Sequence, residues 1–294
     1  MDRNPVAPPV VVGVDGSPSA LDAVAWAADE CARHHLPLRL VHTYFLPATG
    51  YPNMVVSAGD VLAALDAQGR LWLDEAESAA HAVAPGIAVE TSLFSGQAIP
   101  LLIEESAGAT TVVVGSRGLG GFTGLLLGST AAALTAHSHC PVVVVRDQAA
   151  DSGPVVVGVD GSPASESAIA YAFEAASTRD APLTAVLSWT DVLVESAFQA
   201  VRFSMDWSEV EAEQQRLLAE RLAGWQEKFP DVHVDRLVVR DRPERALLRL
   251  AETARLLVVG SRGRGGFSGL LLGSTSQALV HHAPCPLAVV RPTS

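Results

Sequence analysis

Short apolar runs alternate with longer segments of helical periodicity along the whole chain. The first run, VVVGVD at residues 10–15, is rich in β-branched residues and ends in an acid, and the same six letters recur at 155–160. Runs of this kind, without polar alternation, are typical of strands buried on both faces of a parallel sheet. Further strands are predicted at 38–42, 87–94, 111–115 and 142–146, and again at 183–187, 232–239, 256–260 and 287–291.

Helices are predicted between these strands. Ser17-Pro18 and Ser162-Pro163 each follow the first strand of a half, and a serine N-cap before a proline is typical of a helix start. Other helices are predicted at about 61–84, 97–108 and 129–137, and at 208–228, 243–254 and 274–282, whereas 45–60 and 190–208 are interpreted as irregular. Alternating strands and helices indicate an α/β fold, here two tandem open parallel five-stranded sheets with helices on both faces, which is Rossmann-like.

The second half of the chain repeats the first. An offset of 145 residues pairs Asp15 with Asp160 and Cys140 with Cys285. A period this long indicates two whole domains, because solenoid repeats are only about 20–50 residues long. The predicted domains are 1–147 and 154–294, joined by the polar linker DQAADSGP.

Composition excludes several classes of protein. The 294 residues carry a formal net charge of −12, which argues against a nucleic-acid partner because phosphate backbones require a basic surface. The start lacks the pattern of a signal peptide, and the most apolar stretch, 124–136, is too short to span a bilayer. Three cysteines form a sparse, odd set, so a reduced, cytoplasmic protein is expected.

A glycine-rich loop occurs twice after the fourth predicted strand. Residues 115–130 read GSRGLGGFTGLLLGST and residues 260–275 read GSRGRGGFSGLLLGST, so fourteen of the sixteen positions agree. Glycine lets backbone N–H groups approach a phosphate closely, and the helix start that follows adds unpaired donors. Because the carboxyl ends of parallel strands meet at one edge, Asp15 and Asp160 are expected beside these loops. Each Asp would accept from a ribose or base, or hold a metal through water; the alternative is that it caps the next helix.

Common phosphate and metal motifs are absent. The sequence G-x4-G-K-S/T would need a lysine before Ser129, and the dinucleotide motif G-x-G-x-x-G should follow the first strand, where the chain reads GVDGSP. The groups His137, His139, Cys140 and His281, His282, Cys285 do not have zinc-site spacing and are interpreted as helix-end histidines and core cysteines.

The doubled pattern G-x2-G-x9-G-S/T, together with the acid after the first strand and the final CPVVVVR or CPLAVVR strand, resembles the universal stress protein family, in its tandem-domain, ATP-binding form. The resemblance implies a fold like that of the adenine nucleotide α-hydrolases, with Asp15 and Asp160 at the adenosine and the backbones of Val41 and Val186 at the adenine. In the first domain the implied nucleotide site comprises Gly13, Asp15, Val41, Gly115, Ser116, Arg117, Gly118, Leu119, Gly120, Gly121, Gly128, Ser129 and Thr130. In the second it comprises Gly158, Asp160, Val186, Gly260, Ser261, Arg262, Gly263, Arg264, Gly265, Gly266, Gly273, Ser274 and Thr275.

The resemblance further implies a regulatory role in stress response and growth control, with ATP as ligand and Mg²⁺ as its companion ion. It also implies an intrachain pseudo-dimer, in which the fifth strands of the two domains pair, and a homodimer beyond it. The alternatives are a slow ATPase or adenylyl-transferring enzyme and a scaffold without ligand. Phosphoryl transfer needs a metal-holding acid and a group that orients the nucleophile, and the loop supplies Arg117 and hydroxyls only, so no catalytic residue is assigned. Arg117 and Arg262 are cations for an anionic ligand or, alternatively, solvated loop charges.

Overall fold

The computed structural model describes residues 7–46, 58–119, 127–146, 152–189, 207–263 and 271–292. The chain divides into two compact units, Met1–Asp147 and Gln148–Ser294. Among the helices in the described ranges, none is long and apolar enough to cross a membrane.

The first unit is built on a five-stranded parallel sheet. Its strands are β1 (Val10–Gly13), β2 (Leu38–Tyr44), β3 (Val89–Ser95), β4 (Thr111–Gly115) and β5 (Val142–Val145), and they lie in the order β3-β2-β1-β4-β5. Its helices are α1 (Pro18–His34), α2 (Ala58–Val83), α3 (Ala98–Glu105) and α4 (Ser129–His137), and a short 3-10 turn, Ser106–Gly108, follows α3.

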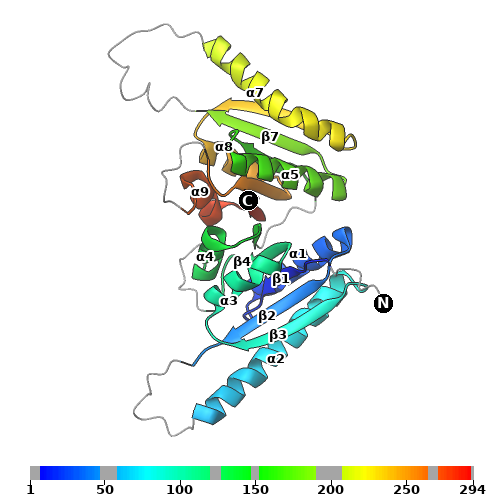
Figure 1. The fold of residues 1–294 in the computed structure, drawn as a ribbon, viewed down its shortest axis with the longest axis vertical. Helices are drawn as coiled ribbons and strands as arrows, with labels where there is room; N and C mark the ends of the chain where they lie inside the picture. The colour runs from blue at the N-terminus through cyan, green and yellow to red at the C-terminus, as the bar shows by residue number, and fades with distance from the viewer. Residues whose placement is uncertain are drawn as a thin grey trace, which may run out of the picture. The chain divides into compact units, whose positions relative to one another are not determined.

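Helices cover both faces of this sheet (Figure 1). The pair α1 and α2 packs on one face, and the pair α3 and α4 packs on the other. The central strands therefore have no solvent-facing side, and the valines of β1, β4 and β5 are at most 4% exposed. This burial on both faces explains why the strands are continuous apolar runs.

The second unit repeats this architecture. Its strands are β6 (Val155–Val159), β7 (Leu183–Trp189), β8 (Val234–Arg240), β9 (Leu256–Gly260) and β10 (Leu287–Val290), in the order β8-β7-β6-β9-β10, again all parallel. Its helices are α5 (Pro163–Thr178), α7 (Trp207–Lys228), α8 (Pro243–Ala251) and α9 (Ser274–His282). Helices α5 and α7 pack together on one face of the sheet, and α8 and α9 pack together on the other. The predicted α/β fold is confirmed.

Candidate functional site

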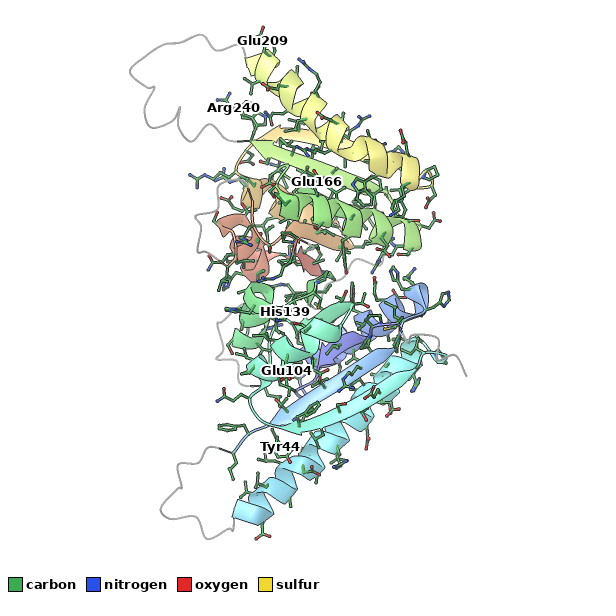
Figure 2. The ribbon with its side chains drawn as sticks, in the orientation of Figure 1. Tyr44, Glu104, His139, Glu166, Glu209 and Arg240 are labelled. Atoms are coloured by element: carbon green, nitrogen blue, oxygen red, sulfur yellow. The ribbon has the colours of Figure 1, made fainter. Side chains whose placement is uncertain are left out.

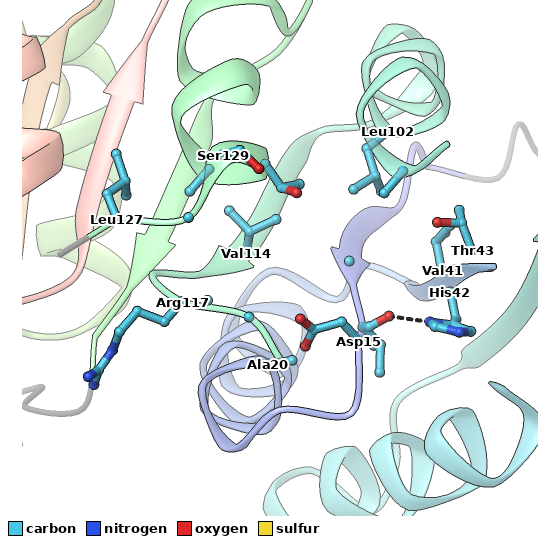
Figure 3. A pocket seen from close by; sticks show the side chains of 18 residues that line it. Asp15, Ala20, Val41, His42, Thr43, Leu102, Val114, Arg117, Leu127 and Ser129 are labelled. Carbon is cyan, nitrogen blue, oxygen red and sulfur yellow. Dashed lines mark hydrogen bonds between the residues drawn. The ribbon is translucent and has the colours of Figure 1, made fainter. Parts of the chain in front are cut away.

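In the first unit, a cavity lies where the chain changes direction across the sheet. The chain winds outward from β1 to β2 and β3, then returns to β4 on the other side of β1. The crossovers on the two sides of this point diverge, and such a switch point leaves a crevice at the carboxyl ends of the strands. A cavity of about 420 Å³ occupies this place (Figure 3). The cavity is lined by the ends of β1, β2 and β4, by the starts of α1, α3 and α4, and by the loop after β4. The lining residues are 13–15, Ala20, 41–43, Ala98, Leu102, Val114, Gly115, Arg117, Gly118 and 127–131.

Asp15 ties the end of β1 to the glycine loop. Its Oδ1 accepts the backbone N–H of Ser17 at 3.0 Å, and its Oδ2 accepts the backbone N–H of Leu119, also at 3.0 Å. The N-cap of α1 is Ser17, whose Oγ accepts the N–H of Ala20 at 3.2 Å and donates to the carbonyl of Arg117 at 3.4 Å. The capping role considered for the aspartate therefore belongs to the serine two residues later.

The second unit has the same arrangement at its corresponding edge. Asp160 Oδ1 accepts the N–H of Ser162 at 2.9 Å. Ser162 caps α5 and donates to the carbonyl of Arg262 at 3.3 Å. A Cβ placed on Gly263 would overlap Asp160 Oδ2, just as a Cβ on Gly118 would overlap Asp15 Oδ2. Glycine is needed at both positions because the carboxylate lies directly against the loop backbone.

Ser116 and Ser261 shape their loops through the backbone. The N–H of Gly128 donates to the carbonyl of Ser116 at 2.8 Å, which closes the loop, and the N–H of Gly273 does the same to Ser261 at 2.8 Å. Both serines are almost fully buried, at 2% and 1% exposure. What the structure shows of their role is the backbone hydrogen bond that closes each loop.

Gly115 and Gly260 are required by packing within each unit. A Cβ on Gly115 would lie 2.5 Å from the carbonyl oxygen of Ser19 in α1. A Cβ on Gly260 would lie 2.8 Å from the carbonyl carbon of Ala164 in α5. The missing side chain lets the end of the strand approach the first turn of the helix.

The helices that follow the two loops begin without a side-chain cap. The N-caps are Gly128 for α4 and Gly273 for α9, and neither helix has a side-chain hydrogen bond from its cap residue. The first N–H groups of a helix need partners, and they attract anions when no side chain supplies one. Ser129 and Ser274 are exposed at these starts, and Thr130 and Thr275 are half-buried. Ser129, Thr130 and the α4 start line the cavity.

Of the remaining candidates in the first unit, Gly13, Val41 and Arg117 line the cavity. At Gly13 a Cβ would lie 3.0 Å from Leu102 Cδ1, so a larger residue would crowd this leucine. In the second unit, a Cβ on Gly158 would likewise lie 3.0 Å from Leu247 Cδ1. Val41 and Val186 are buried at 1% exposure.

Arg117 is exposed, and in Figure 3 its guanidinium points away from both Asp15 and Ser129. Leu119 is 60% exposed. Arg262 and Gly263 are exposed in the second unit. The candidates Gly120, Gly121, Arg264, Gly265 and Gly266 lie outside the described residues.

His42 lines the cavity and was not among the residues expected from the sequence. Its Nδ1 lies 2.7 Å from the carbonyl oxygen of Val14, so this nitrogen carries the proton and donates. Its ring meets the edge of Trp72 with centroids 5.1 Å apart. The counterpart in β7 is Leu187. A comparison of the two halves at the end of this strand would have singled out the histidine.

Within the described ranges, no three His, Cys, Asp or Glu side chains are grouped so as to hold a metal ion.

Comparisons with known proteins agree on one family. The model of the universal stress protein family matches twice, over residues 8–146 and 152–291. A universal stress protein from Mycobacterium tuberculosis is 40% identical over 291 residues, which cover 96% of each chain. Another from Mycolicibacterium smegmatis is 42% identical over 294 residues, which cover 96% of this chain and 97% of the relative.

A solved universal stress protein from Archaeoglobus fulgidus has the same fold, with a TM-score of 0.70 at 18% identity, over 97% of this chain and 96% of that one. The double match and the full-length similarity to curated relatives give the same conclusion. The chain belongs to the universal stress protein family, and it carries two tandem domains of that family.

Proposed function

We propose that each domain binds one adenine nucleotide, with ATP as the natural ligand. In this proposal the protein is a nucleotide-dependent regulatory module of stress response and growth control. The observation that carries it is the clasp between Asp15 and the N–H of Leu119, beside a cavity of about 420 Å³ and a helix start without a side-chain cap. The volume is in the range of small-molecule sites, about 300–1,000 Å³.

The lining suggests how the nucleotide would lie. The adenine would rest on the backbone of Val41 above Gly13, where the wall is apolar. A carboxylate has about four lone-pair positions, and Asp15 uses two for backbone N–H groups, so two remain for ribose hydroxyls. The phosphates would reach from Gly118 to the start of α4, where N–H groups and the hydroxyls of Ser129 and Thr130 meet them. Mg²⁺ would be held mainly by the phosphate oxygens, as is usual for this ion.

Binding without rapid turnover is part of the proposal. Hydrolysis needs a group that orients or deprotonates the attacking water. Among the described residues that line the cavity, the carboxylate that could act as such a group is that of Asp15. Each of its oxygens accepts a backbone N–H. The Nδ1 of His42 is committed to Val14. Both side chains therefore hold backbone groups of the site in place, and this positioning role favours a binding module over the alternative of an ATPase or adenylyl-transferring enzyme.

The direct test is to identify nucleotide that is carried through purification. Mass spectrometry of the denatured, full-length protein should release adenine nucleotide, and calorimetry of the stripped protein with ATP should give two sites per chain. The control is the double variant Gly118→Ala, Gly263→Ala, in which both carboxylates are displaced from their loops. Equal ATP affinity in this variant and in the wild type would reject the proposed site.

A further inference from the structure

A second hollow adjoins the cavity of the first domain. It has a volume of about 320 Å³ and is lined by Thr43, Phe45, Gly96, Gln97, Ala98, Ile99 and Thr130. Among these described residues none carries a charge. Thr130 also lines the main cavity, at the start of α4 where the terminal phosphate is proposed to lie. The hollow is therefore the space into which a ligand would grow if it continued beyond that phosphate.

The corresponding stretch of the second domain is charged. With the 145-residue offset, Arg242 takes the place of Gln97 and Asp241 that of Gly96. Around them, Arg240 replaces Ser95, Arg245 replaces Pro100 and Arg249 replaces Glu104. Figure 2 shows Arg240 where β8 ends in the second domain, and Glu104 on α3 of the first. The four arginines 240, 242, 245 and 249 are all exposed, and they are called here the arginine rim.

Two arginines of the rim lie near one carboxylate, that of Asp241, at the start of α8. Nη1 of Arg245 lies 3.9 Å from Asp241 Oδ1, and Nη1 of Arg249 lies 4.0 Å from Oδ2. The backbone N–H of Arg242 donates to the same Oδ1 at 2.8 Å. Arg249 thus reaches back along the helix, and both long side chains are drawn toward the first turn, next to the residue that replaces Gln97.

Arg240 belongs to the same rim. Its guanidinium carbon lies 5.6 Å from the ring centroid of Trp189, at the end of β7. Stacking on an aromatic ring fixes the direction of an arginine side chain.

Residues 240–249 contain four arginines against two acidic residues, Asp241 and Glu244, in a chain whose net charge is −12. Like charges held close together repel one another, and an anion that enters between them relieves the repulsion. Guanidinium groups also match phosphate oxygens in shape, because they donate two parallel hydrogen bonds. The equivalent stretch of the first domain, 95–104, contains Glu104 as its charged residue and offers no such attraction.

We propose that the arginine rim is an outer anion subsite of the second domain, which takes a further phosphate group beyond the terminal phosphate of the bound nucleotide. The second domain would then select adenine nucleotides with an extended polyphosphate chain, whereas the neutral hollow of the first domain would not. This proposal rests on the proposed nucleotide site, because the position of the terminal phosphate is taken from it.

The test compares ATP with adenosine 5′-tetraphosphate in full-length protein. In the Gly118→Ala chain, which reports on the second domain, the tetraphosphate should bind about tenfold more tightly than ATP, as expected for one added charge-assisted contact. In the Gly263→Ala chain, which reports on the first domain, the two affinities should be equal. Adding Arg242→Gln and Arg245→Gln to the Gly118→Ala chain should reduce the tenfold ratio to about one.

The matched control is Arg236→Gln, which removes one exposed arginine from the middle of β8 and should leave the ratio at tenfold. An equal affinity of the Gly118→Ala chain for both nucleotides, or a ratio that survives Arg242→Gln and Arg245→Gln, would overturn the subsite. If the wild type binds no ATP, the proposed nucleotide site fails, and inorganic tripolyphosphate then tests the rim alone. Binding that is lost with the two glutamines but kept with Arg236→Gln would support the rim, and no binding would reject it.

Discussion

Replacing Gly118 by alanine should weaken nucleotide binding in the first domain while the fold persists. A Cβ at this position would overlap Asp15 Oδ2, the atom that accepts the N–H of Leu119 at 3.0 Å. The carboxylate must rotate away, and the bond that it breaks is one to a charged acceptor, which contributes about 1.5–3 kcal/mol. If the nucleotide needs the loop in its clasped position, ATP affinity should fall about 10- to 100-fold.

Calorimetry on three variants gives the measurement. Gly118→Ala and Gly263→Ala should each reduce the number of tight sites per chain from two to one, and the double variant should have none. Circular dichroism and urea denaturation should show folded protein throughout, because a loss of about 1.5–3 kcal/mol is smaller than the 5–15 kcal/mol that typically stabilises a domain.

Gly108→Ala is the matched control in the first domain. A Cβ at Gly108 meets no atom within 4 Å, and the residue lies in the 3-10 turn after α3. Both ATP affinity and stability should stay close to those of the wild type. Unchanged affinity in Gly118→Ala would refute the reasoning, because it would mean that the clasp between Asp15 and the loop has no part in binding.

Three further predictions concern stability. Gly16→Ala should lower the unfolding free energy of the first domain by about 2 kcal/mol or more in urea titrations, because its φ is +79° and its Cβ would overlap the Trp72 ring; an unchanged midpoint would contradict this. Gly224→Ala, in an open part of α7, should instead stabilise the second domain by about 0.5–1 kcal/mol, and a lower midpoint would show that the site is not open. Burial, and then the charge of Glu30, raises the pKa of Cys31 to about 12, and burial raises the pKa of Cys140 to about 11. Both thiols should therefore resist thiol reagents in native protein at pH 9. Above pH 9 the unfolded chain ionises them first, so stability should fall by up to about 1.4 kcal/mol per pH unit for each thiol until the folded pKa is reached, and a flat profile from pH 9 to 11 would contradict this.

Local signals in the sequence were sufficient to predict the strands and helices and the order in which they follow one another along the chain. The β-branched runs, the Ser-Pro helix starts and the 145-residue repeat predicted two five-stranded α/β units, and the structure has them. The ends of elements were less well predicted. Helix α2 begins at Ala58, before its expected start at 61, and β2 continues past His42 to Tyr44. The extra residues of β2 pair with β3, as Thr43 does with Phe94, whereas Gly59 and Asp60 at the start of α2 are exposed. Such ends commonly differ by one or two residues from any local prediction.

Part of the candidate site also followed from the sequence alone. The acid follows the first strand and the glycine loop follows the fourth. Because the carboxyl ends of parallel strands meet at one edge of the sheet, both must lie at that edge, independently of side-chain packing. The sequence therefore determined that Asp15 and the glycine loop would be neighbours, and the structure joins them through a hydrogen bond between residues 104 positions apart.

Tertiary structure alone decided what each of these residues does. Gly115 is needed for packing against α1, whereas Gly118 is needed because the Asp15 carboxylate lies against the loop. The sequence shows a glycine at both positions and does not distinguish these two roles. His42 lines the cavity because Val14 and Trp72 hold its ring there. The physical reason is that propensity and periodicity act over a few neighbouring residues, whereas close packing is set by segments that the crossovers bring together from distant parts of the chain.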